Sequence, residues 1–384
     1  MKADKIKVLF FAMNDDKFYN PVFNSFALSD RYVCEGLLYL KPEEECFINT
    51  PKSLTIIRNI KDLKLFLGNA NYDVVYFFSM DVLWWKIIDF IPVGKTIIWW
   101  TWGYDIYEHQ SRGVRALLHL PIYKVLTNEY VNRTRSGLVN SIRAIVANLT
   151  TRYYYERIRF RNLRRIDFIQ PVISEEYRML KETYSVNAME YYCPEPRAFY
   201  ESVDIVNKGG DIQIGNSSSY TNNHLDVWQA IKDYIPKGRT VVIPLSYGDK
   251  DYSDYLKGKI QSEDISLTIL DTFMPFEEYS KIISHCSYAV YGVIRQQAVG
   301  NIRIALRSGI KLFFYRDSIV YKHFINKGYC VFAIEDINEN SFVTPLTSEQ
   351  KEINAQASLR EYYERKSIHD KATADILSKI QKEQ

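Results

Sequence analysis

Short apolar runs of strand length alternate with helix-like patterns along the whole chain, and this alternation constrains the fold more than any other feature. The clearest unit lies between Tyr288 and Asp317. An apolar run leads there into the polar loop 295–297, then into a helical pattern that stops at Gly309, and then into a second apolar run. Such strand–loop–helix–strand units are typical of parallel α/β sheets. The sequence therefore predicts an α/β fold with doubly wound sheets.

The repeating units fall into two groups separated by a linker. Cys193-Pro-Glu-Pro-Arg197 opens a polar stretch that ends at a glycine pair, Gly209 and Gly210, and prolines and glycines with little apolar content indicate a linker. We expect two Rossmann-like domains facing a central cleft, with ligands at the carboxyl ends of the strands. The predicted domains are 1–195 and 196–347, followed by a charged helical tail at 348–384. The apolar runs with strand character are 6–12, 33–40, 74–78, 96–101, 166–170, 212–215, 240–244, 266–270, 287–291, 311–314 and 330–333.

Composition excludes several classes of protein. Hydrophobic residues make up 47% and charged residues 25% of the 384 residues, as in a globular protein. No apolar run reaches the roughly 18–20 residues that span a bilayer, and the N-terminal run is interpreted as a first strand rather than a signal peptide. The five cysteines are scattered and never in CxxC spacing, and the six histidines form no HExxH pattern. We therefore expect no disulfide framework, no metal site and a cytoplasmic location.

Positive charge is concentrated in one segment. Between Val131 and Ile166 there are nine arginines, no lysine and one acid, Glu156, so this segment carries +8 in a chain of net charge +3. Basic segments with interleaved aromatic residues bind anionic membrane surfaces, whereas a solvated basic face and single-stranded nucleic acid are the alternatives. We favour the membrane over nucleic acid. The arginines expected at the membrane are Arg157, Arg159, Arg161, Arg164 and Arg165.

The loop after the run 288–291 has the residues of an anion site. Arg295 is followed by Gln296 and Gln297, and Gly300 and Asn301 open the next helical pattern. Unpaired backbone N–H groups and a partial positive charge at a helix N-terminus attract phosphate. The alternative is a polar turn without a ligand. We predict that these five residues bind a diphosphate.

Two further loops follow predicted strands of the second domain. Gly215-Asn-Ser-Ser-Ser-Tyr-Thr-Asn-Asn-His224 offers small and polar side chains at the first βα turn, where Rossmann-like domains hold their ligands. Either this loop binds the donor or it only caps the next helix. Tyr247, beyond the run 240–244, either stacks on a ligand or is a buried end of a strand. The predicted donor contacts here are Asn216, Ser217, Asn222 and Tyr247.

In the first domain, a tryptophan-rich run Trp99-Trp-Thr-Trp-Gly-Tyr-Asp105 ends a predicted strand. A carboxylate beside aromatic surface is partly desolvated, which raises its pKa toward the range of a general base. Asp105 is the first candidate for the catalytic base, with Glu108 and His109 as alternatives. A cap on the following helix is the competing explanation for Asp105, and the tryptophans are equally compatible with plain core packing.

Three of these runs together resemble a known family. The WGxDxYE run (Trp102–Glu108), the GNSxxxxNxH run (Gly215–His224) and the RQQxxGxxxxxxxxGI run (Arg295–Ile310) are similar, in order and spacing, to the bacterial TDP-N-acetylfucosamine:lipid II N-acetylfucosaminyltransferases. This is glycosyltransferase family 56, also described as 4-alpha-L-fucosyltransferase, whose best-known member serves enterobacterial common antigen synthesis. The resemblance covers most of the second half and, in the first half, mainly the WGxD run. The arginine-rich segment and the C-terminal tail depart from it.

The resemblance implies a GT-B fold, a nucleoside diphosphate sugar donor with TDP favoured, and a polyprenyl-diphosphate-linked acceptor at the inner face of the inner membrane. It also implies that no metal cofactor is needed, because helix N-termini and side chains replace Mg²⁺. We therefore expect a peripheral glycosyltransferase that moves a deoxyamino sugar in surface polysaccharide synthesis. A non-catalytic nucleotide-sugar or saccharide-binding partner on the same scaffold is the alternative. A nucleotide-sugar epimerase is disfavoured, because a GxGxxG turn is missing after the first predicted strand.

Overall fold

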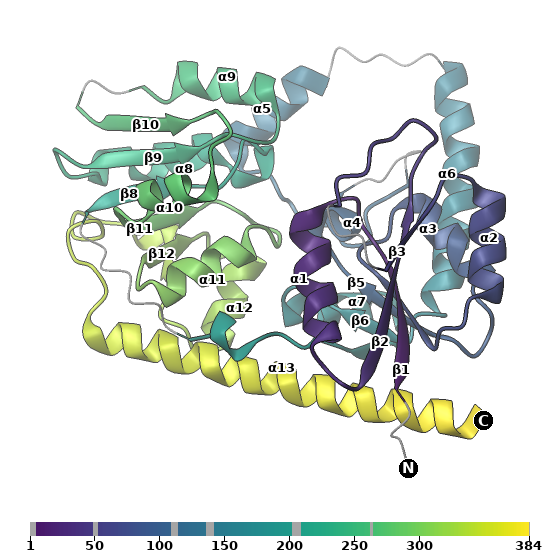
Figure 1. Ribbon diagram of the computed structural model, residues 1–384. Coiled ribbons are helices and arrows are strands. Elements are labelled where there is room, and N and C mark those ends of the chain that lie inside the picture. The colour runs from purple at the N-terminus through teal and green to yellow at the C-terminus, as the bar shows by residue number, and fades with distance from the viewer. Residues whose placement is uncertain are drawn as a thin grey trace. The chain divides into compact units, whose positions relative to one another are not determined.

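The computed structural model describes residues 5–48, 53–108, 114–135, 142–201, 209–261 and 264–383. The chain forms two compact units. Unit 1 comprises Met1–His119, Asn140–Pro196 and Tyr363–Gln384, and unit 2 comprises Leu120–Val139 and Arg197–Tyr362. Each unit is built on its own sheet flanked by helices (Figure 1).

Unit 1 contains a seven-stranded sheet whose neighbouring strands are all parallel, in the order β3-β2-β1-β4-β5-β6-β7. The order reverses between β1 and β4, and in doubly wound sheets ligands bind outside the carboxyl ends of the strands at such a point. The strands are β1 Ile6–Phe11, β2 Tyr32–Tyr39, β3 Leu54–Ile57, β4 Val74–Phe77, β5 Thr96–Trp100, β6 Phe168–Gln170 and β7 Met189–Glu190.

Helices connect these strands, and the strands themselves are almost continuously apolar. All four residues of β4 are buried, as expected for a parallel strand covered on both faces. Phe10, Tyr76 and Phe78 form an aromatic centre with ring centroids 5.4–6.1 Å apart. The helices of unit 1 are α1 Asp16–Ala27, α2 Ile60–Asn69, α3 Val82–Ile87, α4 Gly103–Tyr107, α6 Ile142–Leu163 and α7 Ser174–Tyr184, with the 3₁₀ turn η1 at Ile88–Phe90.

Unit 2 contains a six-stranded parallel sheet in the order β10-β9-β8-β11-β12-β13, which reverses between β8 and β11. The strands are β8 Asp211–Ile214, β9 Thr240–Pro244, β10 Ser266–Leu270, β11 Cys286–Tyr291, β12 Lys311–Phe314 and β13 Phe332–Ala333. The helices are α5 Val125–Arg135, α8 His224–Ile231, α9 Lys250–Lys259, α10 Phe276–Ile283, α11 Val299–Arg307 and α12 Ile319–Asn326, with 3₁₀ turns η3 Arg197–Phe199, η4 Tyr220–Asn222, η5 Lys232–Tyr234 and η6 Ile334–Asp336.

Helix α5 precedes the linker in sequence and yet packs in unit 2. Asp226, in the first turn of α8, accepts hydrogen bonds from the backbone N–H groups of Leu126 (2.8 Å) and Thr127 (3.0 Å) and from the Thr127 hydroxyl (2.7 Å). Tyr130 joins the core cluster of unit 2. Residues 120–135 therefore belong to unit 2, whereas the sequence predicted that they belong to the domain 1–195.

The last helix, α13, runs from Ser348 to Glu383, and its two ends belong to different units. In unit 2, Glu361 accepts hydrogen bonds from Arg303 (2.5 Å) and from the Tyr329 hydroxyl (3.0 Å). In unit 1, the Tyr32 hydroxyl contacts Thr373 Oγ1 (2.9 Å), and Ala372 and Ile376 pack in the core. The tail is thus helical over its described length, but it forms no separate body. No described helix is long and apolar enough to cross a membrane.

Candidate functional site

Two loops meet where the strand order of the unit 2 sheet reverses. The loop after β8 begins at Gly215, whose N–H donates to Val290 O of β11 (3.0 Å). Asn223, at the end of this loop, donates through Nδ2 to Gly292 O in the loop after β11 (2.7 Å). The two predicted donor loops are therefore held side by side at the carboxyl edge of the sheet, the position at which doubly wound sheets bind ligands.

Gln297 links the two loops through its side chain. Its Oε1 accepts a hydrogen bond from the Thr221 hydroxyl, and its Nε2 donates to Asn216 Oδ1 (3.4 Å). Asn216 in turn donates through Nδ2 to the Tyr247 hydroxyl (2.7 Å), which ties in the end of β9. Tyr247 is 57% exposed, so its ring is open to a ligand rather than buried at a strand end.

Helix α11 starts at this junction without a side-chain cap. Its N-cap residue, Ala298, has left-handed backbone angles (φ 59°) and makes no capping hydrogen bond with its side chain. Gly300 is exposed and Asn301 is half-buried in the first turn. Backbone N–H groups of a helix N-terminus that lack a cap favour an anion.

Arg295 and Gln296 lie deeper than the rest of the loop, with exposed fractions of 8% and 9%. Arg295 donates through Nη1 to Gln296 O (2.8 Å), which fixes the guanidinium against its own loop. Ser217 is also buried, and its carbonyl and hydroxyl accept hydrogen bonds from Asn222 Nδ2 (3.0 and 3.1 Å). These buried side chains shape the loops, and Tyr247, Gln297, Gly300 and Asn301 form their accessible surface.

Gly292 is a functional position that the sequence analysis missed. A Cβ there would lie 2.3 Å from Asn222 O and 2.5 Å from Val227 Cγ2, so only glycine allows the two loops to cross. The signal in the sequence is a glycine directly after a buried strand, which indicates a close approach of backbone.

Asn222 and His224, at the end of the loop after β8, have buried polar atoms. Within the described part of the chain, Asn222 Oδ1 and both ring nitrogens of His224 are buried without a hydrogen-bond partner. Burial lowers the pKa of His224 to about 3, so the ring is neutral. A Cβ on Gly215 (φ 65°) would lie 2.6 Å from His224 Nε2, which explains the glycine at the start of this loop.

Asp105 holds a loop of unit 1 together and does not reach solvent. It is 0% exposed, and its carboxylate accepts hydrogen bonds from Trp102 N (2.7 Å), Met80 N (3.0 Å) and Trp99 Nε1 (3.0 Å). Its bond to Trp102 N belongs to the capping box of α4, which was the competing explanation for this residue. The structure shows the capping role of Asp105, whose carboxylate has no exposed surface, and its role as the base stays a prediction.

Of the two alternative candidates for the base, the structure describes Glu108 but not His109. Glu108 is half-buried at the C-terminal end of α4, whereas His109 lies outside the described residues.

A second buried carboxyl group, Glu176, accepts a hydrogen bond from Val172 N (3.2 Å). Burial raises the pKa of Asp105 to about 7 and that of Glu176 to about 8, and the Asp105 charge adds to the rise at Glu176.

The predicted membrane arginines divide into structural and exposed residues. Arg159 is 1% exposed and donates to Arg115 O (2.6 Å), and Arg165 donates to Ile88 O (2.6 Å). Arg161 pairs with Asp89. Arg157 and Arg164 are exposed. Arg159 does not fit the predicted role, because its guanidinium is enclosed by protein.

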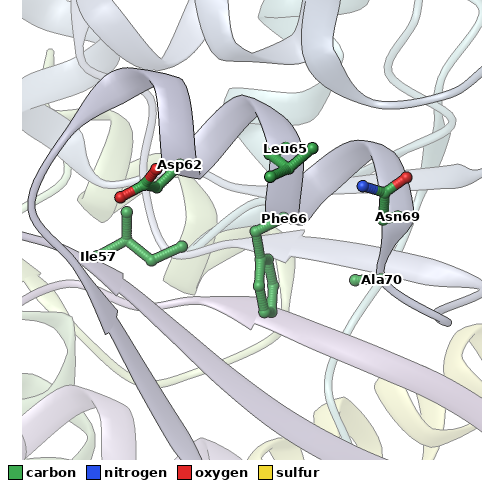
Figure 2. A pocket seen from close by; sticks show the side chains of 6 residues that line it. All are labelled: Ile57, Asp62, Leu65, Phe66, Asn69 and Ala70. Carbon is green, nitrogen blue, oxygen red and sulfur yellow. The ribbon is translucent and has the colours of Figure 1, made fainter.

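The described part of unit 1 includes two pockets with a volume of about 450 Å³ each. One lies between β3 and α2 and is mostly apolar, with its carboxylate, Asp62, bound to Asn59 at the start of α2 (Figure 2). The other opens at the carboxyl ends of β1, β2 and β4, where the strand order reverses. Among the described residues, no group of three or more His, Cys, Asp or Glu is placed to hold a metal ion.

The comparison with known families identifies the catalytic class. Residues 195–357 match the family model described as 4-alpha-L-fucosyltransferase glycosyl transferase group 56. This region is similar to the group 56 glycosyltransferases. The match contains both loops of the unit 2 junction, and the protein is a glycosyltransferase.

Solved structures share the fold at low sequence identity. Sucrose-phosphate synthase from Thermosynechococcus elongatus is 9% identical, with a TM-score of 0.58 and 99% of each chain covered. Anabaena HepE, solved with UDP and glucose, is 10% identical, with a TM-score of 0.54 and 98% of each chain covered. The lipopolysaccharide outer core galactosyltransferase WaaB is 11% identical, with a TM-score of 0.51, 99% of this chain and 100% of that chain covered. The glycosyltransferase has the predicted GT-B fold, with two parallel-sheet α/β domains.

Proposed function

We propose that this glycosyltransferase moves a deoxyamino sugar, such as N-acetylfucosamine, from a nucleoside diphosphate to a polyprenyl-diphosphate-linked saccharide in surface polysaccharide synthesis. TDP is the favoured carrier. The observation that carries the proposal is the junction of two loops at the reversal point of the unit 2 sheet, inside the region that matches group 56.

The leaving diphosphate would bind at the start of α11. The N–H groups of the first turn and the amides of Gln297 and Asn301 supply donors, and the nearby Arg295 supplies positive charge. Negative charge develops on the leaving group as the sugar–oxygen bond breaks, so fixed donors stabilise the transition state. This arrangement performs the task of a divalent cation, and we propose that transfer needs no metal.

The donor base and sugar would lie beside Tyr247. Its exposed ring is fixed through Asn216, which allows it to stack on a flat base at a low entropic cost. Thermal-shift measurements with TDP, UDP and GDP on the full chain test this proposal. A ligand at 100 times its Kd stabilises the folded state by about 2.7 kcal/mol, and we expect the largest shift with TDP.

Helix α6 offers the surface for an anionic membrane. Tyr153 (69% exposed), Arg157, Phe160 (42% exposed) and Arg164 recur at helical spacing and are all exposed. Aromatic rings and arginines on one helix face suit the interface of anionic lipids. We propose that this face brings the enzyme to its lipid-linked acceptor at the inner membrane, as a peripheral protein.

Loss of sugar transfer tests the function directly. In an assay that follows transfer from a TDP-sugar to a polyprenyl-diphosphate saccharide in detergent, Gln297→Ala should lower kcat/KM at a temperature at which the variant is fully folded. Arg239→Ala, at the start of β9 and thus at the opposite edge of the sheet, is the control. Full activity of Gln297→Ala would remove the junction from the donor site.

A further inference from the structure

We propose that the segment Leu120–Arg135, called the strap below, sets the affinity of the unit 2 junction for a nucleoside diphosphate, and that Asn223 is the positioning residue through which it acts. The inference rests on the proposed function, because it concerns the control of the same donor site. The strap belongs to unit 2, and its helix α5 lies beside α8 (Figure 1). It lies outside residues 195–357, so its role does not follow from the match with group 56.

The side chain of Asn223 joins three segments of unit 2. Its Oδ1 accepts a hydrogen bond from the backbone N–H of Lys124 in the strap (2.8 Å). Its Nδ2 donates to Ile122 O in the strap (3.1 Å) and to Gly292 O in the loop after β11 (2.7 Å). Asn223 itself ends the loop after β8 and is completely buried. One amide group therefore connects the strap to both donor loops.

The strap determines which way this amide points. An amide oxygen only accepts hydrogen bonds and an amide nitrogen only donates them. The N–H of Lys124 therefore holds Oδ1 toward the strap, and Nδ2 is left for the carbonyl of Gly292. Without the strap the amide would be free to rotate, and the buried carbonyl of Gly292 would lose this donor. Because an unpaired buried polar group is costly, the loop after β11 would shift to find another partner.

Gly292 lies at the start of the loop that carries the proposed diphosphate donors. Arg295 and Gln297 follow in the same loop, and α11 begins at Val299. Donors that are fixed before the ligand arrives bind it more tightly than donors that must first be ordered. A shift of the loop at Gly292 would move these donors, so loss of the strap should weaken the binding of a diphosphate.

Two further contacts hold the strap in place. The carboxylate of Asp226, in the first turn of α8, accepts the hydrogen bonds of Leu126 and Thr127 described above. Hydrogen bonds to an ionised group are about twice as strong as neutral ones. The ring of Tyr130 lies 5.9 Å from that of Tyr220, between centroids, and Tyr220 belongs to the loop after β8. The strap thus contacts the donor loops at both of its ends.

Strap attachment and nucleotide binding are linked in both directions. If attachment of the strap raises the affinity for a nucleoside diphosphate, the nucleotide must stabilise the attachment by the same factor. TDP should therefore slow the hydrogen exchange of the backbone N–H groups of Lys124, Leu126 and Thr127, although none of them is a proposed donor contact. Exchange of the strap that does not change when TDP binds would contradict this linkage.

Asn223→Gly tests the positioning residue in the full-length protein. Glycine adopts the left-handed backbone of this position (φ 50°) without strain, so the variant removes the side-chain hydrogen bonds and keeps the turn. Calorimetry with TDP should give a Kd at least about 10-fold higher, a usual size for coupling between two sites. The titration is done at a temperature at which circular dichroism shows the variant to be fully folded, so loss of folded protein does not contribute. An unchanged Kd would overturn the role of Asn223.

Asp226→Asn tests the strap at its other attachment and leaves Asn223 intact, which keeps the inference open to test if Asn223→Gly does not fold. Asparagine retains only one of the two acceptor oxygens, so the Kd for TDP should rise at least about 3-fold. Glu129→Gln makes the same kind of change on the exposed surface of α5 and is the control, with the wild-type Kd expected. A raised Kd in Asn223→Gly with an unchanged Kd in Asp226→Asn would show that Asn223 acts without the strap.

Failure of this inference is distinguishable from failure of the proposed function. If TDP binds the wild-type protein and both variants equally, the strap has no role and the donor site stands. If the wild-type protein binds none of TDP, UDP and GDP, the donor assignment is wrong, and the control of affinity falls with it. Exchange in the free protein then tests the positioning alone. Asn223→Gly should speed the exchange of the peptide that contains Gly292 and Gln297, and unchanged exchange there would overturn it.

Discussion

Replacing Gly292 gives a quantitative test of the close contact between the loop after β8 and the loop after β11. In Gly292→Ala, the new Cβ would lie 2.3 Å from Asn222 O, a backbone atom that cannot rotate away. The loops must separate, which costs about 1–3 kcal/mol of overpacking. The buried hydrogen bond from Asn223 Nδ2 to Gly292 O (2.7 Å) would weaken as well, at about 1 kcal/mol. We therefore expect unit 2 to lose about 2–4 kcal/mol of stability.

Gly300→Ala is the matched control. No atom lies within 4 Å of a Cβ at Gly300, which is in the first turn of α11. Replacement of a helical glycine by alanine reduces the entropy of the unfolded chain and stabilises by about 0.4–1 kcal/mol. Hydrogen–deuterium exchange, read on the peptides that contain β8 and β11, reports the opening free energy of this region in each variant. Equal protection in Gly292→Ala and wild type would refute the reasoning.

Three further predictions concern charge. Arg295→Ala should weaken TDP binding by about 30-fold or more in calorimetry, as expected for loss of one partner of a buried charge pair, and unchanged affinity would exclude it from the diphosphate site. Burial raises the pKa of Asp105 to about 7 and that of Glu176 to about 8, so the folded state binds more protons than the unfolded state. Unit 1 should therefore lose stability in urea titrations as the pH rises from 5 to 8. Glu176→Gln should flatten this pH dependence of stability, and a flat profile for the wild-type protein would contradict the prediction. Arg157→Gln combined with Arg164→Gln should reduce sedimentation with vesicles containing phosphatidylserine at 0.1 M salt, and unchanged sedimentation would remove the membrane face of α6.

The sequence predicts the sheets well because parallel strands buried on both faces are continuous apolar runs. Predicted strands at 74–78 and 240–244 match β4 and β9 within one residue. Two strands were missed for the opposite reason. The edge strand β3 has a single buried residue, and β7 has two residues with none buried, so neither leaves a hydrophobic signal.

The site was less predictable, because burial depends on tertiary packing. Asp105 in a tryptophan-rich run was expected to be partly desolvated, and the fold encloses it completely. The residues Asn14, Asp15 and Asp16 follow the first strand, and in the sequence they indicate only that a glycine motif is missing there. Asp15 and Asp81 line the same pocket, because the parallel pairing of β1 and β4 brings them to the same edge of the sheet. The separation of Asp15 and Asp81 along the chain does not indicate that the two residues are close in the fold.

Because helix α13 contributes residues to both units, the two units receive their last residues at different times during synthesis on the ribosome. Unit 2 has its full sequence once Tyr362 is made, whereas unit 1 still lacks the part of α13 that contributes His369, Ala372 and Ile376 to its interior. Synthesis of unit 1 therefore begins before that of unit 2 and ends after it. Until then the part of the unit 1 core that contains Tyr32 lacks Ala372 and Ile376. A premature stop codon shortly after Tyr362 would therefore leave unit 1, rather than unit 2, open to aggregation and proteolysis.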